Sequence, residues 1–283
     1  MERVWKLPAI YLTILLALLL VTGCAAEQVV EEELPVVEEV VETGTLAFTA
    51  NGEEFIREGF VCKDGWELSF DHAYVTLTSI SAFQTDPPFE TEMGWEFEDL
   101  VQVRIDLAGV HTVDLAAPDA DPAVVGEAAS VPVGRYNAIY WEMVRASDGP
   151  SEGFVVLLVG TAEKDGETIN FSLGLDREVS YLGGEYVGDE RKGILQAGGS
   201  ADVEMTFHFD HLFGDFDEDP GDEINLEALG FGPLAALAVD GALEVSLSDL
   251  ETKLAEGDYA LLLAVMTHLA HVGEGHALAA FME

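Results

Sequence analysis

Alternation of apolar and polar positions dominates the body of the chain, residues 44–209. In the segment 70–83, Val75 and Leu77 lie on one face and Thr76 on the other, which is the two-residue period of a half-buried β-strand. Short runs of the same kind, separated by Gly, Pro and Asp turns, predict further strands at 45–49, 100–107, 135–144, 154–159, 168–175 and 202–209. Many short strands joined by turns predict an antiparallel β-sandwich.

Beyond the sandwich the spacing of apolar positions becomes helical. Ser248, followed three residues later by Glu251, forms a capping-box pattern and predicts a helix that runs to about residue 255. Asp258 predicts the N-cap of a second helix at 259–272, which is apolar nearly all round and which we expect to pack against the sandwich. The predicted fold class is therefore α+β, mainly β: an antiparallel β-sandwich with a C-terminal helical segment packed on it.

The N-terminus has the pattern of a secretory signal. Arg3 and Lys6 precede an apolar run at 10–21, and small residues lead into Cys24. The run is shorter than the about 20 apolar residues that a transmembrane helix needs. A pair of small residues directly before a cysteine is similar to the lipobox of bacterial lipoproteins, which implies acylation of Cys24. The alternative is an ordinary secretion signal with a chance cysteine.

A tether follows the proposed lipid anchor. Residues 27–42 alternate valine pairs with glutamates around Pro35 and have no period that would bury one face, so they predict a solvated acidic spacer. By the lipobox resemblance, Ala25 after Cys24 implies an outer-membrane address facing the periplasm in a two-membrane bacterium. The predicted organisation is a signal peptide at 1–23, an acidic tether at 24–43, the sandwich at 44–209 and an acidic, histidine-containing helical segment at 210–283.

Composition excludes several classes of function. The 283 residues include 12 Lys and Arg against 54 Asp and Glu, a net charge of -42 at pH 7, which excludes nucleic acid as a partner. Two cysteines exclude a disulfide-scaffolded mini-protein and a four-cysteine zinc site. With Cys24 acylated, Cys62 is the remaining thiol, and its apolar neighbours favour a buried structural role.

Three short motifs resemble an uncharacterised family of bacterial extracytoplasmic lipoproteins, over about residues 44–145. They are Tyr74-Val75-Thr76-Leu77-Thr78-Ser79-Ile80, Thr112-Val113-Asp114-Leu115 and Val133-Gly134-Arg135-Tyr136-Asn137. Members of that family have an immunoglobulin- or transthyretin-like sandwich in which a Gly-x-Tyr opens a late strand. The resemblance implies a fold and an address, and no activity.

Imidazoles and carboxylates gather in the last third of the chain. Five of the seven histidines lie between residues 208 and 276, and no Lys or Arg occurs from 193 to 252. One pair lies at the end of the last predicted strand, and a second lies three residues apart on the predicted helix, where the two side chains project from one side. The candidate metal ligands are His208, His211, His268, His271 and His276, with the carboxylates of Asp210 and Glu274.

Neither histidine pair is a sufficient site alone, because a stable transition-metal centre generally takes three or four protein ligands. We therefore expect His208 or His211 to share one site with the histidines from 268 to 276. Imidazole with carboxylate favours zinc, and Cu(II), Ni and Fe also fit, whereas the lack of clustered Cys or Met argues against Cu(I). The alternative for His268 and His271 is stabilisation of the helix C-terminus.

A weaker cation candidate is the acidic loop 215–223. Asp215, Asp217 and Asp219 place hard oxygen ligands at alternate positions, as in calcium loops. Pro220 and the missing acid at the twelfth position break the EF-hand pattern, so a solvated acidic loop is the favoured interpretation. His72 and His111 belong to the sandwich and receive no role from the sequence.

Contiguous catalytic motifs are absent from the sequence: it has no His-Glu-x-x-His, no Gly-x-Ser-x-Gly and no phosphate-binding loop. We therefore predict a lipid-anchored, extracytoplasmic and non-enzymatic protein that binds a divalent transition metal for scavenging, delivery or sensing. The alternatives are a metal-dependent hydrolase that uses the same histidines and a structural or adhesive sandwich without metal.

The anchor is testable by Cys24→Ala. This change removes the thiol that would be acylated, so lipid labelling and membrane fractionation are both lost while the folded part stays intact. Incorporation of a labelled fatty acid and cell fractionation measure the two effects, and Cys62→Ala is the control that keeps the label. Retention of the Cys24→Ala protein in the membrane fraction contradicts the prediction.

Overall fold

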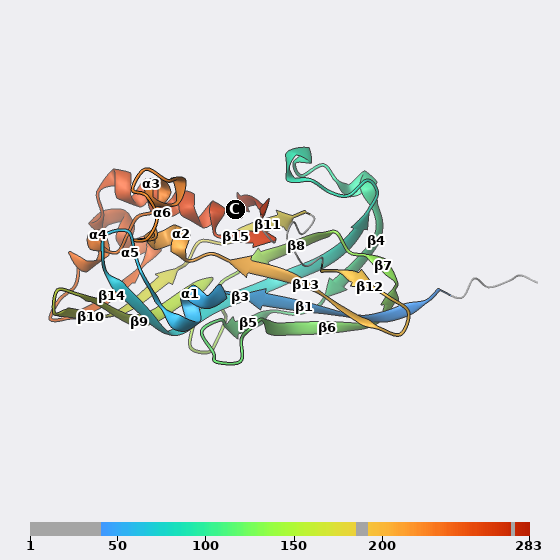
Figure 1. The fold of residues 1–283 in the computed structure, drawn as a ribbon, viewed down its shortest axis with the longest axis horizontal. Helices are drawn as coiled ribbons and strands as arrows, with labels where there is room; N and C mark the ends of the chain where they lie inside the picture. Colours follow the sequence, from blue (N-terminus) through green and yellow to red (C-terminus); the bar gives the residue numbers. More distant parts are fainter. Residues whose placement is uncertain (1–40, 185–191, 273–274) are drawn as a thin grey trace, which may run out of the picture. The chain divides into compact units, whose positions relative to one another are not determined.

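Two large β-sheets enclose the main hydrophobic core in the computed structural model, which describes residues 41–184, 192–272 and 275–283 (Figure 1), and two short strands, 134–135 and 194–195, pair as a third sheet. The strands are β1 (Thr43–Asn51), β2 (Phe60–Val61), β3 (Glu67–Thr85), β4 (Val101–Leu107), β5 (His111–Asp114), β6 (Ala123–Pro132), β7 (Gly134–Arg135), β8 (Ala138–Met143), β9 (Val156–Lys164), β10 (Glu167–Leu175), β11 (Val179–Gly183), β12 (Ile194–Leu195), β13 (Ser200–Phe207), β14 (Ala242–Ser246), β15 (Ala270–Val272), β16 (Gly275–His276) and β17 (Leu278–Phe281). The helices are α1 (Glu53–Glu58), α2 (Asp210–Phe213), α3 (Glu223–Glu227), α4 (Gly232–Ala235), α5 (Leu247–Lys253) and α6 (Glu256–His268), with 3₁₀ turns η1 (Thr91–Met93) and η2 (Glu98–Leu100).

The smaller sheet has the strand order β16–β15–β13–β1–β6. The larger sheet has the order β14–β10–β9–β3–β8–β11–β17, and β2, β4 and β5 also pair with β3. The pairs β1–β13 and β10–β14 are parallel, and the other pairings between described strands of the two sheets are antiparallel. The predicted fold class, α+β and mainly β with a sandwich body, is confirmed, and the two parallel pairs are an addition to it.

Strand β3 is the centre of the larger sheet and is 19 residues long. Val75 and Leu77, predicted to share its core face, are both fully buried. The register of β3 shifts between Phe70 and His72 and again between Thr78 and Ser81. Such bulges bend a strand, which lets one segment pair with different partners along its length.

The C-terminal segment supplies strands as well as helices. Strand β14 extends the larger sheet beside β10, β17 pairs with β11, and the β15–β16 hairpin extends the smaller sheet beside β13. Residues 41–283 accordingly form one compact unit. The boundary expected at residue 209 therefore marks a change from strand-like to helix-like spacing of apolar residues within that unit.

The helix boundaries differ from those predicted. The capping box of α5 is formed by Ser246 and Asp249, not by Ser248 and Glu251. Helix α6 has Ala255 rather than Asp258 at its N-cap, and it ends at His268 instead of continuing to residue 272. The cause of the early end is strand pairing, because residues 270–272 hydrogen-bond to the edge of β13 as strand β15.

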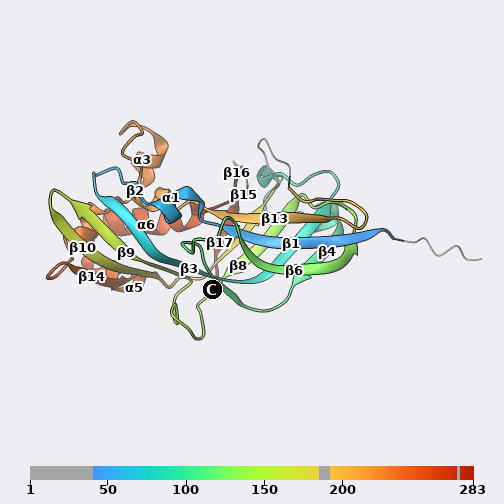
Figure 2. The same ribbon diagram turned by 60° about the horizontal axis from the view of Figure 1, so that its bottom comes forward.

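Helix α6 packs on the sandwich through one side, as expected from its apolar composition (Figure 2). Leu262, Val265 and Met266 are buried, and the hydroxyl of Tyr181 in β11 donates a hydrogen bond to the carbonyl of Met266. Other positions of α6, including Ala264, are exposed. The even distribution of apolar residues around α6 therefore overstates how much of the helix is covered.

The two sheets meet beside the end of β13. The ring of Phe207 lies edge-on to Trp141 of β8, with 6.4 Å between ring centroids, and both side chains are fully buried. Because Phe207 immediately precedes His208, this contact fixes where the polar end of the strand leaves the core.

Cys62 is a buried free cysteine, as predicted. Burial and the neighbouring Asp64 carboxylate, whose Oδ1 lies 2.9 Å from the Cys62 sulfur, raise the pKa of this thiol to about 12. The thiol is therefore protonated at neutral pH, which suits a structural residue. The predicted signal, Cys24 and the tether up to residue 40 lie outside the described residues. Within the part of the chain that the structure describes, no helix is long and apolar enough to cross a bilayer.

Phe207→Ala tests the contact between the sheets. Truncation of a buried Phe costs about 3–5 kcal/mol of unfolding free energy, because it leaves a cavity in addition to the lost burial. Phe216→Ala is a matched control, since the Phe216 side chain is 61% exposed and surface changes stay within about 0.5 kcal/mol. Urea denaturation measures both. Equal effects of the two changes would contradict this account of the core.

Candidate metal centre

Five histidines from separate elements converge at one end of β13. His208 follows that strand directly, and its backbone N–H donates to the Leu269 carbonyl at 2.9 Å. His211 lies in the first turn of α2, and His268 is the last residue of α6. His271 and His276 face each other as a cross-strand pair of β15 and β16.

The spacing of the rings tests which pairs can share a metal. A nitrogen that binds zinc at about 2.0–2.1 Å puts the ring centre about 3.2 Å from the ion and two ligand rings about 5–6 Å apart. Four pairs have such centroid distances: His208–His211 at 5.6 Å, His211–His271 at 5.2 Å, His211–His276 at 5.8 Å and His268–His276 at 5.8 Å. The expected approach of the two histidine groups is therefore present.

His271 is packed more closely against its neighbours. Its ring centroid lies 4.2 Å from that of His208 and 4.2 Å from that of His276. These contacts put His271 at the middle of the five-histidine cluster. The expectation that it projects from the same helix as His268 is wrong, because α6 has ended before it.

A group of three residues at this place could hold a metal ion. His208, Asp210 and His211 each offer one ligand atom, an imidazole nitrogen or a carboxylate oxygen, and these three atoms lie within 4.8 Å of one another. Asp210 is buried, and its Oδ1 lies 3.8 Å from Nδ1 of His208.

Two buried polar atoms of the cluster lack a hydrogen-bond partner among the described residues. They are Nε2 of His271 and Oδ1 of Asp210, and both residues are only 6% exposed. A buried polar group without a partner costs about 1–3 kcal/mol, so such groups are uncommon in folded proteins. A carboxylate oxygen and an imidazole nitrogen are both atoms that a bound cation would satisfy.

Burial favours the neutral form of three imidazoles of the cluster, those of His211, His271 and His276. Burial is the main cause that lowers the pKa of His271 to about 3, and the neighbouring histidines add to the shift. Burial also lowers the pKa of His211 and of His276. For Asp210, burial raises the pKa and the nearby His211 offsets only part of the change. Neutral imidazole is the form that binds metal.

Sequence reasoning missed two carboxylates of the site. Oε2 of Glu53, the first residue of α1, lies 3.5 Å from Nδ1 of His208. Oε2 of Glu227 in α3 lies 3.5 Å from Nδ1 of His268. Glu53 is far from the histidines along the chain and offers no local signal. Glu223 and Glu227 are one helical turn apart, which is a pattern that could have been noticed.

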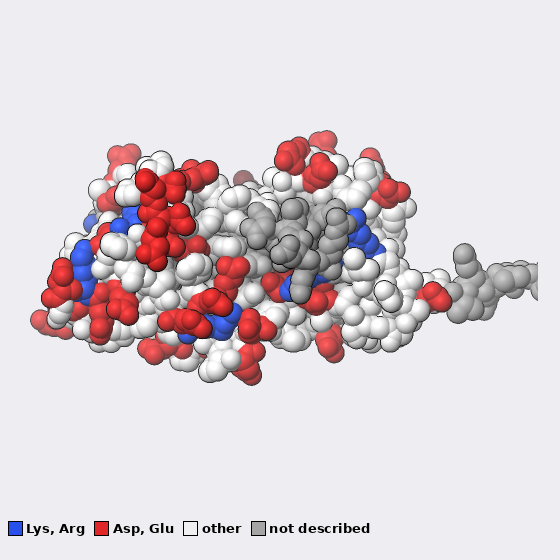
Figure 3. Space-filling view, in the orientation of Figure 1, with Lys and Arg blue, Asp and Glu red and all other residues white. Residues whose placement is uncertain are grey.

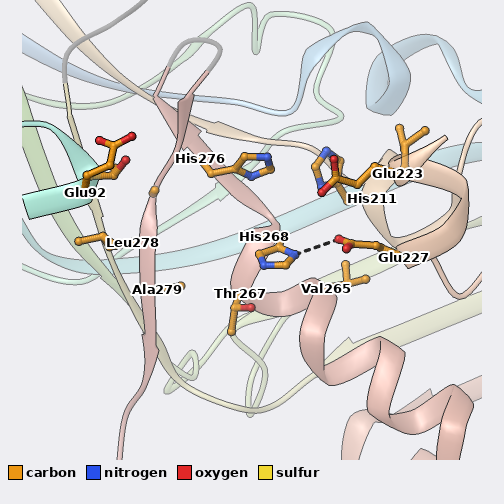
Figure 4. Close-up of a pocket in the computed structure, with 13 residues that line it drawn as sticks. Glu92, His211, Glu223, Glu227, Val265, Thr267, His268, His276, Leu278 and Ala279 are labelled. Carbon is orange, nitrogen blue, oxygen red and sulfur yellow. Dashed lines mark ion pairs between the residues drawn. The ribbon is translucent and has the colours of Figure 1, made fainter. Parts of the chain in front are cut away.

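An open cleft of about 690 Å³ adjoins the cluster (Figure 4). His211, His268 and His276 line it together with Glu223 and Glu227. Its remaining lining is mostly apolar or small and includes Val265, Leu278 and Ala279. Some of the imidazoles are thus accessible from solvent, whereas His271 lies behind them.

The acidic loop before α3 is organised by an amide. Figure 3 shows a dense group of acidic side chains in this region. The buried Asn225 donates from Nδ2 to the backbone carbonyls of Asp215, Glu218 and Asp219 at 2.8, 3.3 and 3.2 Å. Asp217 and Asp219 are exposed. The calcium prediction for Asp215, Asp217 and Asp219 gains no support, because the amide binds carbonyls that a calcium loop would turn toward the ion.

The remaining candidates lie elsewhere. Glu274 is outside the described residues, so its prediction as a ligand stays open. His72 binds Asp114, with 2.7 Å between Nδ1 and Oδ2, and Nε2 of His111 lies 3.1 Å from the Ala108 carbonyl oxygen. Both belong to the larger sheet and neither joins the cluster. Comparisons of the chain with protein-family models, curated proteins and solved structures gave no match.

The buried imidazole predicts how the stability of the metal-free protein depends on pH. His271 takes up a proton near pH 6.5 when unfolded but only near pH 3 when folded. Between these values the unfolded chain binds more protons, so the free energy of unfolding falls as the pH falls. His271→Gln keeps polar atoms in place and removes this proton, which reduces the slope by up to about 1.4 kcal/mol per pH unit.

Urea denaturation of the chelator-treated protein at several pH values between 7.5 and 4.5 measures the slope. His111→Gln is the control for loss of an imidazole, because His111 lies outside the cluster. Identical slopes for His271→Gln and the wild type would show that His271 is not a buried neutral imidazole.

Proposed function

We propose that this protein binds a divalent transition metal through the histidine cluster, as a lipid-anchored protein of the bacterial cell envelope. Scavenging, delivery and sensing of the metal are the roles that suit such a protein. The localisation follows from the predicted signal, Cys24 and the tether, and it awaits the fractionation experiment described above.

The observation that carries the proposal is the group formed by His208, Asp210 and His211, together with two buried atoms that lack a hydrogen-bond partner among the described residues, Oδ1 of Asp210 and Nε2 of His271. His271 lies against this group, within the cluster of five imidazoles. A folded chain bears the cost of such atoms most readily where a ligand satisfies them. A metal ion supplies the positive charge that no Lys or Arg between residues 193 and 252 provides.

Zinc is the metal that this donor set favours, with Cu(II), Ni and Fe as further candidates. Imidazole and carboxylate are borderline or hard ligands, and they suit all four ions. Cys62 is not a member of the group that could hold a metal, and its thiol contacts Asp64. The Irving–Williams order makes copper the strongest competitor, so the bound metal depends on supply as well as on the ligands.

A metal-dependent hydrolase is the second candidate, and one observation favours it. The cleft of about 690 Å³ reaches His211, His268 and His276, so a metal bound there could keep an open coordination position toward solvent. Metal-dependent hydrolysis that disappears together with metal binding would favour this candidate over a purely binding role.

Elemental analysis of the detergent-purified full chain is the decisive test. We expect zinc or a related ion to co-purify, and zinc at about 100 times its dissociation constant to raise the free energy of unfolding by about 2.7 kcal/mol. His211→Ala should lower zinc affinity at least about tenfold, since loss of a residue that only hydrogen-bonds to a metal ligand already lowers metal affinity by about that factor. His111→Ala is the matched control and keeps the wild-type affinity.

A protein that contains no metal after chelator-free purification, and that added zinc does not stabilise, contradicts the proposal. It would favour the third alternative, a structural or adhesive sandwich in which the histidines only stabilise the fold. Equal zinc affinity of His211→Ala and the wild type would locate the metal elsewhere.

A further inference from the structure

We infer that the cleft contains a second, outer metal position formed by His268, His276 and Glu227. The inference rests on the proposed metal-binding function, and it divides the cluster into two positions. The inner one is built on His208, Asp210 and His211, and the outer one opens to the cleft.

Ring spacing sets His268 apart from the inner histidines, whereas His276 contacts both His268 and the rings of His211 and His271. The ring centroids of His268 and His276 lie 5.8 Å apart, which is within the about 5–6 Å expected for two imidazoles on one metal. Among the described residues, the ring contact of His268 is with His276 alone. His268 therefore extends the cluster in a direction that the inner group does not reach.

Helix α3 brings the carboxylate that completes the set. Oε2 of Glu227 lies 3.5 Å from Nδ1 of His268, and Glu223 and Glu227 both line the cleft near His276 (Figure 4). Helix α3 is held in place by Lys63, whose Nζ donates to the Asn225 carbonyl at 2.8 Å. Two imidazoles and a carboxylate are the protein ligands of many open zinc sites.

Exposure sets the outer position apart from the inner one. The side chains of His268 and Glu227 are 46% and 53% exposed, whereas those of His208 and Asp210 are 19% and 8% exposed. Flexible, solvated ligands bind a metal less tightly because they lose more freedom on binding. We therefore expect the outer ion to bind more weakly than the inner one, with a coordination position left open to the cleft.

The competing interpretation is a simple ion pair. A protonated His268 at the C-terminus of α6 would be stabilised both by Glu227 and by the helix dipole, without any metal. The ion pair predicts one metal per chain, and the outer position predicts two.

Zinc titration of the full chain distinguishes these interpretations. Calorimetry gives the affinities, and elemental analysis after gel filtration counts the bound zinc. Excess Mg²⁺ in the buffer occupies the acidic surface, because Mg²⁺ prefers oxygen ligands. We expect two equivalents in the wild type. Glu227→Gln and His268→Ala should each weaken the second equivalent at least about tenfold and leave the tighter one within about threefold.

The reciprocal variant and the controls complete the design. His208→Ala should weaken the tighter equivalent and keep the outer one. Glu244→Gln changes an exposed carboxylate of β14, outside the cleft, and His111→Ala changes an imidazole outside the cluster, so both should keep two equivalents.

The outcomes separate this inference from the proposed function. One equivalent in the wild type, unaffected by Glu227→Gln and His268→Ala, overturns the outer position and keeps the inner site. No zinc bound by any variant overturns both. Loss of both equivalents in a Glu227→Gln protein that circular dichroism shows to be folded overturns the division into two positions.

Discussion

The arrangement of the candidate site depends on one set of backbone hydrogen bonds, those that join β15 to the free edge of β13. Thr206 lies opposite His271 in this pairing, and the N–H of His208 donates to the Leu269 carbonyl just beyond it. An unpaired strand edge is a row of unsatisfied donors and acceptors, so the chain gains by ending α6 and adding a strand. That exchange draws residues about sixty positions apart into contact.

At this edge, apolar packing buries polar side chains. The rings of Phe207 and Phe209 on either side of His208 are buried, which ties the imidazole to the core. The same burial removes water from Asp210 and His271, raising the pKa of the carboxyl and lowering that of the imidazole. Burial thus disfavours the charged forms of Asp210 and His271, and a divalent cation beside them would act in surroundings of low dielectric, where its charge has most effect.

Acidic residues surround the cleft that leads to the histidine cluster. Glu223 and Glu227 stand on α3 at the cleft, in a chain with a net charge of -42. A strongly negative surface raises the local concentration of cations. The carboxylate side chains range from the exposed Glu227 at the cleft to the buried Asp210 in the cluster. Lys192 neutralises a different buried carboxylate, that of Glu204.

Local patterns in the sequence were sufficient for the strands that alternate or are wholly apolar, for the buried Cys62, and for the choice of histidines. Period two and the clustering of imidazoles are properties of neighbouring residues, so the chain displays them before it folds. Strand β15 could not be predicted from the sequence, because residues 270–272 continue a helical pattern. They form a strand because they pair with the edge of β13, which is distant along the chain. Glu53 was out of reach for the same reason, because its place beside His208 comes from long-range packing of α1. The spacing of Glu223 and Glu227 was visible in the sequence, but the place of Glu227 beside His268 comes from long-range packing of α3. The sequence by itself determined which histidines are candidates for a site, and only the tertiary structure decided which of them meet, since strand pairing acts between residues that are remote along the chain.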